Sequence, residues 1–173
     1  MKKCVFAIIA IALTSVIYGC SDDKKDEATK TAAPAMAWEA NPDFGITDIA
    51  EQMDINIRIT AEAGIGKFVV TVNSETLAPF ISYMTTDGSA DMDLIGDTKL
   101  IGTLSDLGIA GLPMGDDLKN KTDVLFSLSG LVPMIAALGP ADGSEHTFIL
   151  KMADNENRTL TRELKFRYVA PKE

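Results

Sequence analysis

The chain has 173 residues, with 16 basic and 25 acidic side chains and a formal net charge of −9. Such acidity repels phosphate backbones, and no stripe of Lys and Arg with interleaved aromatic residues offsets it, so the composition disfavours nucleic-acid binding. The length suits one domain with a real hydrophobic core, even after removal of a leader.

The first twenty residues predict export and a lipid anchor. Lys2 and Lys3 precede an apolar run over residues 4–18, which is shorter than the roughly 20 residues that a membrane-spanning helix needs. The run ends in Ile17-Tyr18-Gly19-Cys20, which resembles the lipobox of bacterial lipoproteins. The resemblance implies a signal peptide over 1–19, cleavage before Cys20, and attachment of a lipid with palmitate-type acyl chains to Cys20. A transmembrane anchor is the alternative.

Residues 20–37 predict a flexible linker behind the lipidated cysteine, because they are charged and then Ala/Thr-rich, without apolar periodicity. The acidic residues within 21–27 resemble the surface-export tag of Bacteroidetes lipoproteins. This implies a location on the outer leaflet of the outer membrane; the alternative is a solvated tether on a periplasm-facing domain. Loss of Lys2 and Lys3 with the leader would leave 14 basic and 25 acidic residues, a net charge of −11.

Cysteine chemistry is absent from the expected mature chain. Cys4 lies inside the predicted signal, and lipid would block the thiol of Cys20. We therefore expect no disulfide, no cysteine nucleophile and no cysteine-ligated metal, so that packing alone holds the core together.

The remaining residues predict a mainly β fold. Alternation with a period of two predicts half-buried strands, and apolar residues at helical spacing predict short helices. In chain order the predicted elements are strands 54–60 and 67–72, helices 74–84 and 98–107, strand 122–128, helix 129–138, and strands 147–152 and 162–169. A polar turn at 153–158 joins the last two strands as a hairpin. We expect a single antiparallel β-sandwich over residues 38–170 with short helical connections; an α+β domain is the alternative.

A family resemblance supports the same fold. Trp38-Glu39-x-Asn41-Pro42-Asp43-Phe44, followed by Ala63-Gly64-Ile65 and the strand up to Val72, resembles the Ig-like domains of Bacteroidetes cell-surface lipoproteins. Leu112-Pro113-x-Gly115-Asp116 and His146-Thr147-Phe148 agree in kind. Some of those domains sit beside a carbohydrate-metabolism domain. The resemblance implies an Ig-like sandwich rather than a particular activity.

No enzyme is predicted. His146 is the lone histidine, and a general base would also need a nucleophile and an orienting carboxylate. We expect His146 to be exposed at the start of a strand. The motifs of serine hydrolases, zinc proteases and phosphate-binding loops do not occur.

The densest acidic cluster comprises Asp87, Asp91, Asp93 and Asp97. Calcium binding is one interpretation, but the spacing lacks the fifth-position ligand and the twelfth-position glutamate of an EF-hand. We favour a solvated acidic loop, and therefore predict no metal and no cofactor.

Two further features could contact a partner. Trp38, Phe44, Tyr83 and Tyr168 are candidates for a sugar-stacking platform, with Trp38 and Tyr83 as the possible ligand contacts. We favour the other interpretation, in which Trp38 packs at the domain's entry edge and the others fill the core. The apolar, uncharged segment 107–115 is either a docking loop or a cover over one end of the sandwich.

These patterns favour a non-catalytic outer-membrane lipoprotein that acts as a binding or interaction module in a cell-surface assembly, for adhesion or glycan capture. Its expected partners are the membrane, through Cys20, and an envelope protein or glycan. Direct carbohydrate binding and a structural spacer are the alternatives.

Overall fold

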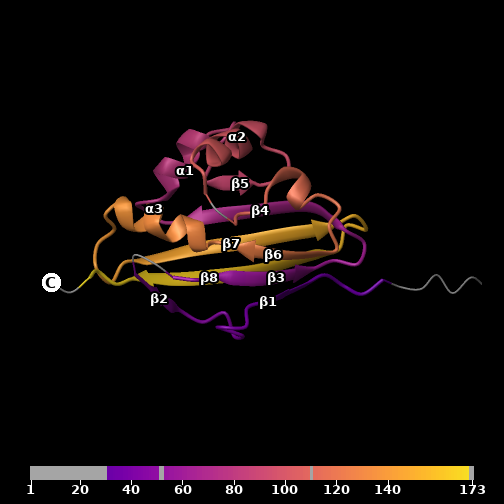
Figure 1. The fold of residues 1–173 in the computed structure, drawn as a ribbon, viewed down its shortest axis with the longest axis horizontal. Helices are drawn as coiled ribbons and strands as arrows, with labels where there is room; N and C mark the ends of the chain where they lie inside the picture. The colour runs from indigo at the N-terminus through magenta and orange to yellow at the C-terminus, as the bar shows by residue number, and fades with distance from the viewer. Residues whose placement is uncertain (1–30, 51–52, 110, 172–173) are drawn as a thin grey trace, which may run out of the picture. The chain divides into compact units, whose positions relative to one another are not determined.

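The computed structural model describes residues 31–50, 53–109 and 111–171, which belong to one unit beginning at Thr31 (Figure 1). The strands are β1 (Ala35–Ala37), β2 (Thr47–Ile49), β3 (Asn56–Thr60), β4 (Ile65–Asn73), β5 (Asp91–Asp93), β6 (Asp123–Ser127), β7 (Glu145–Asp154) and β8 (Thr159–Tyr168). The helices are α1 (Ala78–Met84), α2 (Thr98–Asp106) and α3 (Val132–Ala137), and the 3-10 turns are η1 (Gly115–Asp117) and η2 (Ser129–Leu131). All five predicted strands and all three predicted helices are therefore confirmed.

The strands form two sheets whose order is that of an immunoglobulin domain. The smaller sheet runs β1-β3-β6 and is antiparallel throughout, whereas the larger runs β2-β8-β7-β4-β5. Only the β2–β8 pair in the larger sheet is parallel. Strand for strand, β1-β3-β6 correspond to A-B-E and β8-β7-β4-β5 to G-F-C-C′ of a variable-type domain. The predicted Ig-like antiparallel β-sandwich is confirmed, with α2 and η1 in the chain where strand D would lie.

The two sheets are held together by aromatic and aliphatic packing. The rings of Phe68 on β4 and Phe126 on β6 have centroids 4.9 Å apart, across the space between the sheets. Both side chains are fully buried. Phe148 and Phe166 add a second contact at 5.5 Å within the larger sheet. Phe68 lies on β4, which corresponds to strand C, the strand that carries the core tryptophan in antibody domains. In this protein, phenylalanine rings fill that part of the core.

The three helices extend the core beyond the smaller sheet. Ile81 of α1, Leu104 of α2 and Ile135 of α3 meet Met92 of β5 and Phe148 of β7 around a small apolar void of about 30 Å³. Figure 1 shows α1 and α2 beside β5. Pro79 and Pro133 both lie in the first turn of their helices, where the missing N–H costs nothing.

The folded unit begins earlier than the predicted boundary at residue 38. Strand β1 lies within the predicted linker and pairs with β3, and its Met36 is buried. The Thr31 hydroxyl donates to a Glu156 carboxylate oxygen at 2.9 Å, and its carbonyl accepts from the guanidinium of Arg158. The linker prediction failed here because a three-residue strand with alanines on both sides of one methionine has too little periodicity to detect.

We predict that packing between the sheets dominates the stability of the unit. Phe126→Ala should lower the free energy of unfolding by about 3–5 kcal/mol, because it removes a fully buried ring and leaves a cavity. Leu125→Ala is the matched control on the same strand, since Leu125 is 62% exposed; it should cost less than about 1 kcal/mol. Urea denaturation of both variants tests this, and equal losses would contradict it.

Candidate ligand-binding groove

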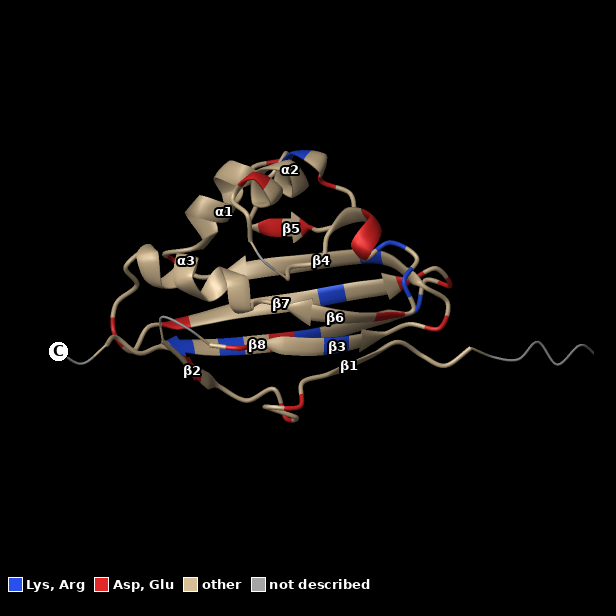
Figure 2. Ribbon diagram, in the orientation of Figure 1, with Lys and Arg blue, Asp and Glu red and all other residues tan. Residues whose placement is uncertain are grey.

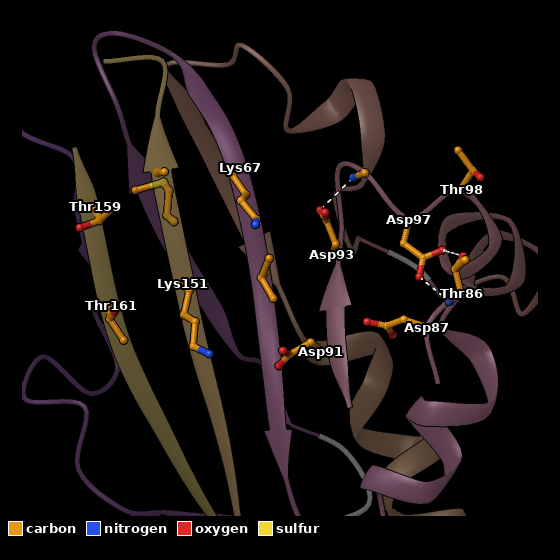
Figure 3. A pocket seen from close by; sticks show the side chains of 14 residues that line it. Lys67, Thr86, Asp87, Asp91, Asp93, Asp97, Thr98, Lys151, Thr159 and Thr161 are labelled. Atoms are coloured by element: carbon orange, nitrogen blue, oxygen red, sulfur yellow. Dashed lines mark hydrogen bonds between the residues drawn. The ribbon is translucent and has the colours of Figure 1, made fainter. Parts of the chain in front are cut away.

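An open groove of about 870 Å³ lies on the outer face of the larger sheet (Figure 3). Its floor is built from the outward-pointing residues of three neighbouring strands, because alternate side chains of a strand point to opposite faces. These residues are Lys67 and Val69 of β4, Lys151 and Ala153 of β7, and Thr159 and Thr161 of β8. The same strands point their other side chains into the core.

Strand pairing orders the floor into rows. Asp93 of β5 lies opposite Val69, Val69 lies opposite Lys151, and Lys151 lies opposite Thr161. A row across the groove therefore reads acid, valine, lysine, threonine on four adjacent strands. Figure 2 shows the acidic β5 in red at one side, with basic residues in blue on β7 and β8.

One wall of the groove is the connection from β5 to α2, and its shape is fixed by Asp93. The Asp93 Oδ1 accepts hydrogen bonds from the backbone N–H of Ile95 at 3.1 Å and of Gly96 at 2.8 Å. A Cβ at position 96 would lie 2.6 Å from the Asp93 Oδ2. A larger residue at position 96 would therefore have to displace the Asp93 carboxylate.

Asp97 ties this wall to α1 and α2. Its carboxylate caps α2 by accepting from the N–H of Leu100 at 3.0 Å. It also accepts from the Thr86 N–H at 2.8 Å and the Thr86 hydroxyl at 2.6 Å. Burial by itself would raise the pKa of Asp97, but these hydrogen bonds outweigh it and hold the pKa below its usual range.

The other wall carboxylates are also held in place. Asp87 accepts from the Ser89 N–H at 2.9 Å, and hydrogen bonds from Ser89 lower the pKa of Asp87. Asp91 accepts a short hydrogen bond from the Thr71 hydroxyl through Oδ1. For Asp91 and Asp93, Oδ2 accepts no hydrogen bond within the described part of the chain. Each wall acid is thus oriented while keeping acceptor capacity.

The two lysines of the floor form no ion pair with any residue that the structure describes. No carboxylate of the described residues lies within 4 Å of the ammonium group of Lys67 or Lys151. Outside the groove but on the same sheet, Lys165 pairs with Glu163 at 3.3 Å. Figure 3 shows both floor lysines extending toward the side that carries Asp91 and Asp93. The groove therefore presents positive, negative and hydroxyl groups that do not neutralise one another.

The structure separates the predicted aromatic contacts. Trp38 is 1% exposed, with its indole packed edge-on against Phe44 and Phe166 at 6.0 and 6.2 Å between centroids. The prediction of Trp38 as a ligand contact is therefore wrong for this structure, because a core ring cannot stack on a ligand. Tyr168 is likewise buried, whereas Tyr83 on α1 is 84% exposed. Tyr83 remains a predicted contact and does not line the groove.

His146 is buried rather than exposed, which corrects the prediction for the start of its strand. Its Nδ1 lies 2.7 Å from the Ser74 hydroxyl and its Nε2 lies 3.0 Å from the Ser144 hydroxyl. The ring is 2% exposed, and burial lowers its pKa below 6.5. Residue 146 points to the same side of β7 as Phe148 and Leu150, which is the core side. The imidazole is therefore buried, and its two nitrogens form hydrogen bonds with serine hydroxyl groups.

The apolar segment 107–115 is divided between core and surface. Leu112 is 6% exposed and belongs to the core, while Leu107 is 49% exposed. Gly115 joins the end of the segment to the sheet by donating its N–H to the Leu94 carbonyl at 2.7 Å. The cover interpretation therefore holds for Leu112 and not for Leu107.

The described residues contain no group of three or more His, Cys, Asp or Glu arranged to hold a metal ion. The calcium interpretation of the acidic segment 87–97 accordingly gains no support. Cys20, the predicted lipidation site, lies outside the described residues. None of the helices in the described ranges combines the length and apolar character that crossing a bilayer requires.

Sequence reasoning identified the acidic wall but not the floor opposite it. Lys67, Lys151, Thr159 and Thr161 are ordinary polar positions in alternating strands, and alternation does predict that they point outward. Nothing local in the sequence indicates that β4, β7 and β8 are neighbours in this order. The pairing between strands, rather than any motif, creates the groove.

Comparison with known proteins adds little to the geometry. No protein-family model matches the sequence, and no curated protein is significantly similar to it. A solved structure of murine CRIg is 12% identical, with 82% of this chain and 100% of that chain covered and a TM-score of 0.29. The assignment as an Ig-like sandwich rests on the strand order described above.

We predict that the buried His146 makes the unit less stable in weak acid. Unfolded His146 binds a proton near pH 6.5, whereas the folded ring binds one only at lower pH. The contribution of neutral His146 to the free energy of unfolding is therefore fully present above about pH 6.5. It is lost as the pH falls from that value toward the lowered pKa of the folded state.

Denaturation of wild type and His146→Gln at pH values from about 7.5 to 5 tests this. The wild type should lose stability over this range, and His146→Gln should show a flatter profile. The carboxylates with lowered pKa values lose their stabilising contribution mainly below about pH 5, so they contribute little over this range. Identical slopes for the two proteins would contradict the assignment.

Proposed function

We propose that the protein is a non-catalytic, lipid-anchored binding module of the bacterial outer membrane that captures an envelope component in its groove. The groove carries the proposal: it is open, and its lining includes lysines and oriented aspartates that form no ion pair with one another among the described residues. The leader pattern that ends at Cys20 supports membrane attachment, since two or three acyl chains anchor a protein stably. The acidic residues within 21–27 support display on the cell surface.

The geometry favours binding over two alternatives. The role of a structural spacer does not require a groove whose opposite charges are held apart, whereas a binding role does. An aromatic sugar-stacking platform is not supported either, because no aromatic residue lines the groove and Trp38 is buried. The acidic wall is held by hydrogen bonds to Thr86, Ile95 and Gly96, which is typical of a pre-formed binding site.

We expect a photoreactive residue in the groove to capture the bound component in living cells. Thr161 is exposed on the groove floor, so p-benzoylphenylalanine at this position should give a light-dependent adduct of defined mass. The matched control places the same residue at Thr60, which is exposed on the outer face of the smaller sheet. Equal adducts at both positions, or none at 161, would place binding elsewhere.

We also expect the anchor to depend on Cys20. Cys20→Ser should remove the protein from the outer-membrane fraction, because no lipid can then be attached. Protease added to intact cells should digest the wild-type protein if it faces outward. Retention of Cys20→Ser in the outer-membrane fraction would contradict lipidation, and complete protection from protease would indicate a periplasm-facing domain.

A further inference from the structure

We propose that the groove binds an oligosaccharide that carries both ammonium and carboxylate groups. The inference rests on the proposed binding role of the groove and specifies the chemical class of its ligand. It follows from three properties of the groove: the separation of its charges, the hydroxyl groups beside them, and the pairing of the backbone beneath.

Opposite charges in the groove lie on different strands, with two acids on β5 and one lysine each on β4 and β7. Asp91 and Asp93 lie on β5, and Lys151 lies two strands away on β7 in the row that contains Asp93 and Val69. Adjacent strands are about 4.8 Å apart, so the backbones at Asp93 and Lys151 are separated by roughly 10 Å. This spacing leaves room for a ligand between the two charges, and their ammonium and carboxylate groups do not approach within 4 Å.

The separated charges select against ligands of one sign. A purely anionic chain would pair with Lys67 and Lys151 but would face the carboxylates of Asp91 and Asp93. A purely cationic chain would pair with the two aspartates but would be repelled by the two lysines. A ligand with both charges can place its carboxylates on the lysines and its ammonium groups on the aspartates. Such charge-assisted hydrogen bonds are stronger than neutral ones. The free Oδ2 atoms of Asp91 and Asp93 are available acceptors for an ammonium group.

The surroundings favour a saccharide over a peptide. Thr159 and Thr161 add hydroxyl groups beside Lys151, and a polyhydroxylated ligand can exchange hydrogen bonds with them. Peptides that bind to sheets commonly pair with a free backbone edge. Beneath the groove floor, β4 is paired on both sides by β5 and β7, and β7 on both sides by β4 and β8. The edge of the sheet beside the groove is β5, which has only three residues and offers a peptide little backbone to pair with. On the floor, side chains therefore make the contacts.

The experiment compares two probes with one backbone. Heparosan oligosaccharides alternate glucuronate with N-acetylglucosamine and are anionic, whereas their N-deacetylated form also carries an ammonium group on each glucosamine. Titration calorimetry with the full chain in detergent should give about tenfold tighter binding for the deacetylated form. Asp91→Asn with Asp93→Asn should abolish this preference, and Lys151→Gln should weaken binding of both forms about tenfold.

The variants keep the wall intact, because the Asn side-chain oxygen can still accept from the N–H groups of Ile95 and Gly96. Glu163→Gln with Lys165→Gln is the matched control: it removes an ion pair on the same sheet outside the groove and should leave both affinities unchanged. Equal binding of the two probes, tighter binding of the anionic form, or binding of neither would overturn the ligand class.

Failure of this inference is distinguishable from failure of the proposed function. A light-dependent adduct at Thr161 without binding of the deacetylated probe would retain the groove as a binding site and reject the zwitterionic saccharide. Absence of both would reject the groove itself. Probe binding that is unchanged in the Asp91→Asn and Asp93→Asn variant would also overturn the inference, because the wall would then make no contribution.

Discussion

The alternation of side chains along β4, β7 and β8 is the constraint on which both the core and the groove depend. Phe68, Leu150 and Leu164 point inward from these strands and are fully buried. Their neighbours in the sequence point outward and form the groove floor. A slip of one residue in any pairing would exchange the two sets, placing lysine in the core and phenylalanine in the groove. The cost of burying an unpaired charge thus fixes the register of the groove floor.

The wall is rigid for a separate reason. Asp87, Asp91 and Asp93 each accept hydrogen bonds through one oxygen, from the local backbone or from a threonine hydroxyl. Asp97 accepts from Thr86 through both of its oxygens. Asp97 also caps α2, whose Leu100 and Leu104 are fully buried. The wall is therefore connected through a helix cap to the hydrophobic core. Its conformation is set before any ligand arrives, which reduces the entropy lost on binding.

Much of the fold could be predicted from the sequence, but little of the site could. The strands with long alternation, such as residues 147–152 and 162–169, were identified, although the structure extends each of them. Strands β1, β2 and β5 have three residues each, too few for a period to register. The burial of Trp38 agrees with the favoured interpretation, whereas His146 was expected to be exposed because its burial comes from the packing of distant segments. The groove floor depends on strand order, which no local pattern encodes.

The overall charge of the protein bears on which ligands reach the groove. The chain has a formal net charge of −9, which repels polyanions at long range and accumulates cationic groups at its surface. Lys67 and Lys151 are local exceptions in this field, set into the floor beside an acidic wall. A chain with ammonium and carboxylate groups has no large net charge to be repelled, and it can pair its anionic groups only after it enters the groove. Long-range repulsion and short-range pairing therefore favour the same class of ligand.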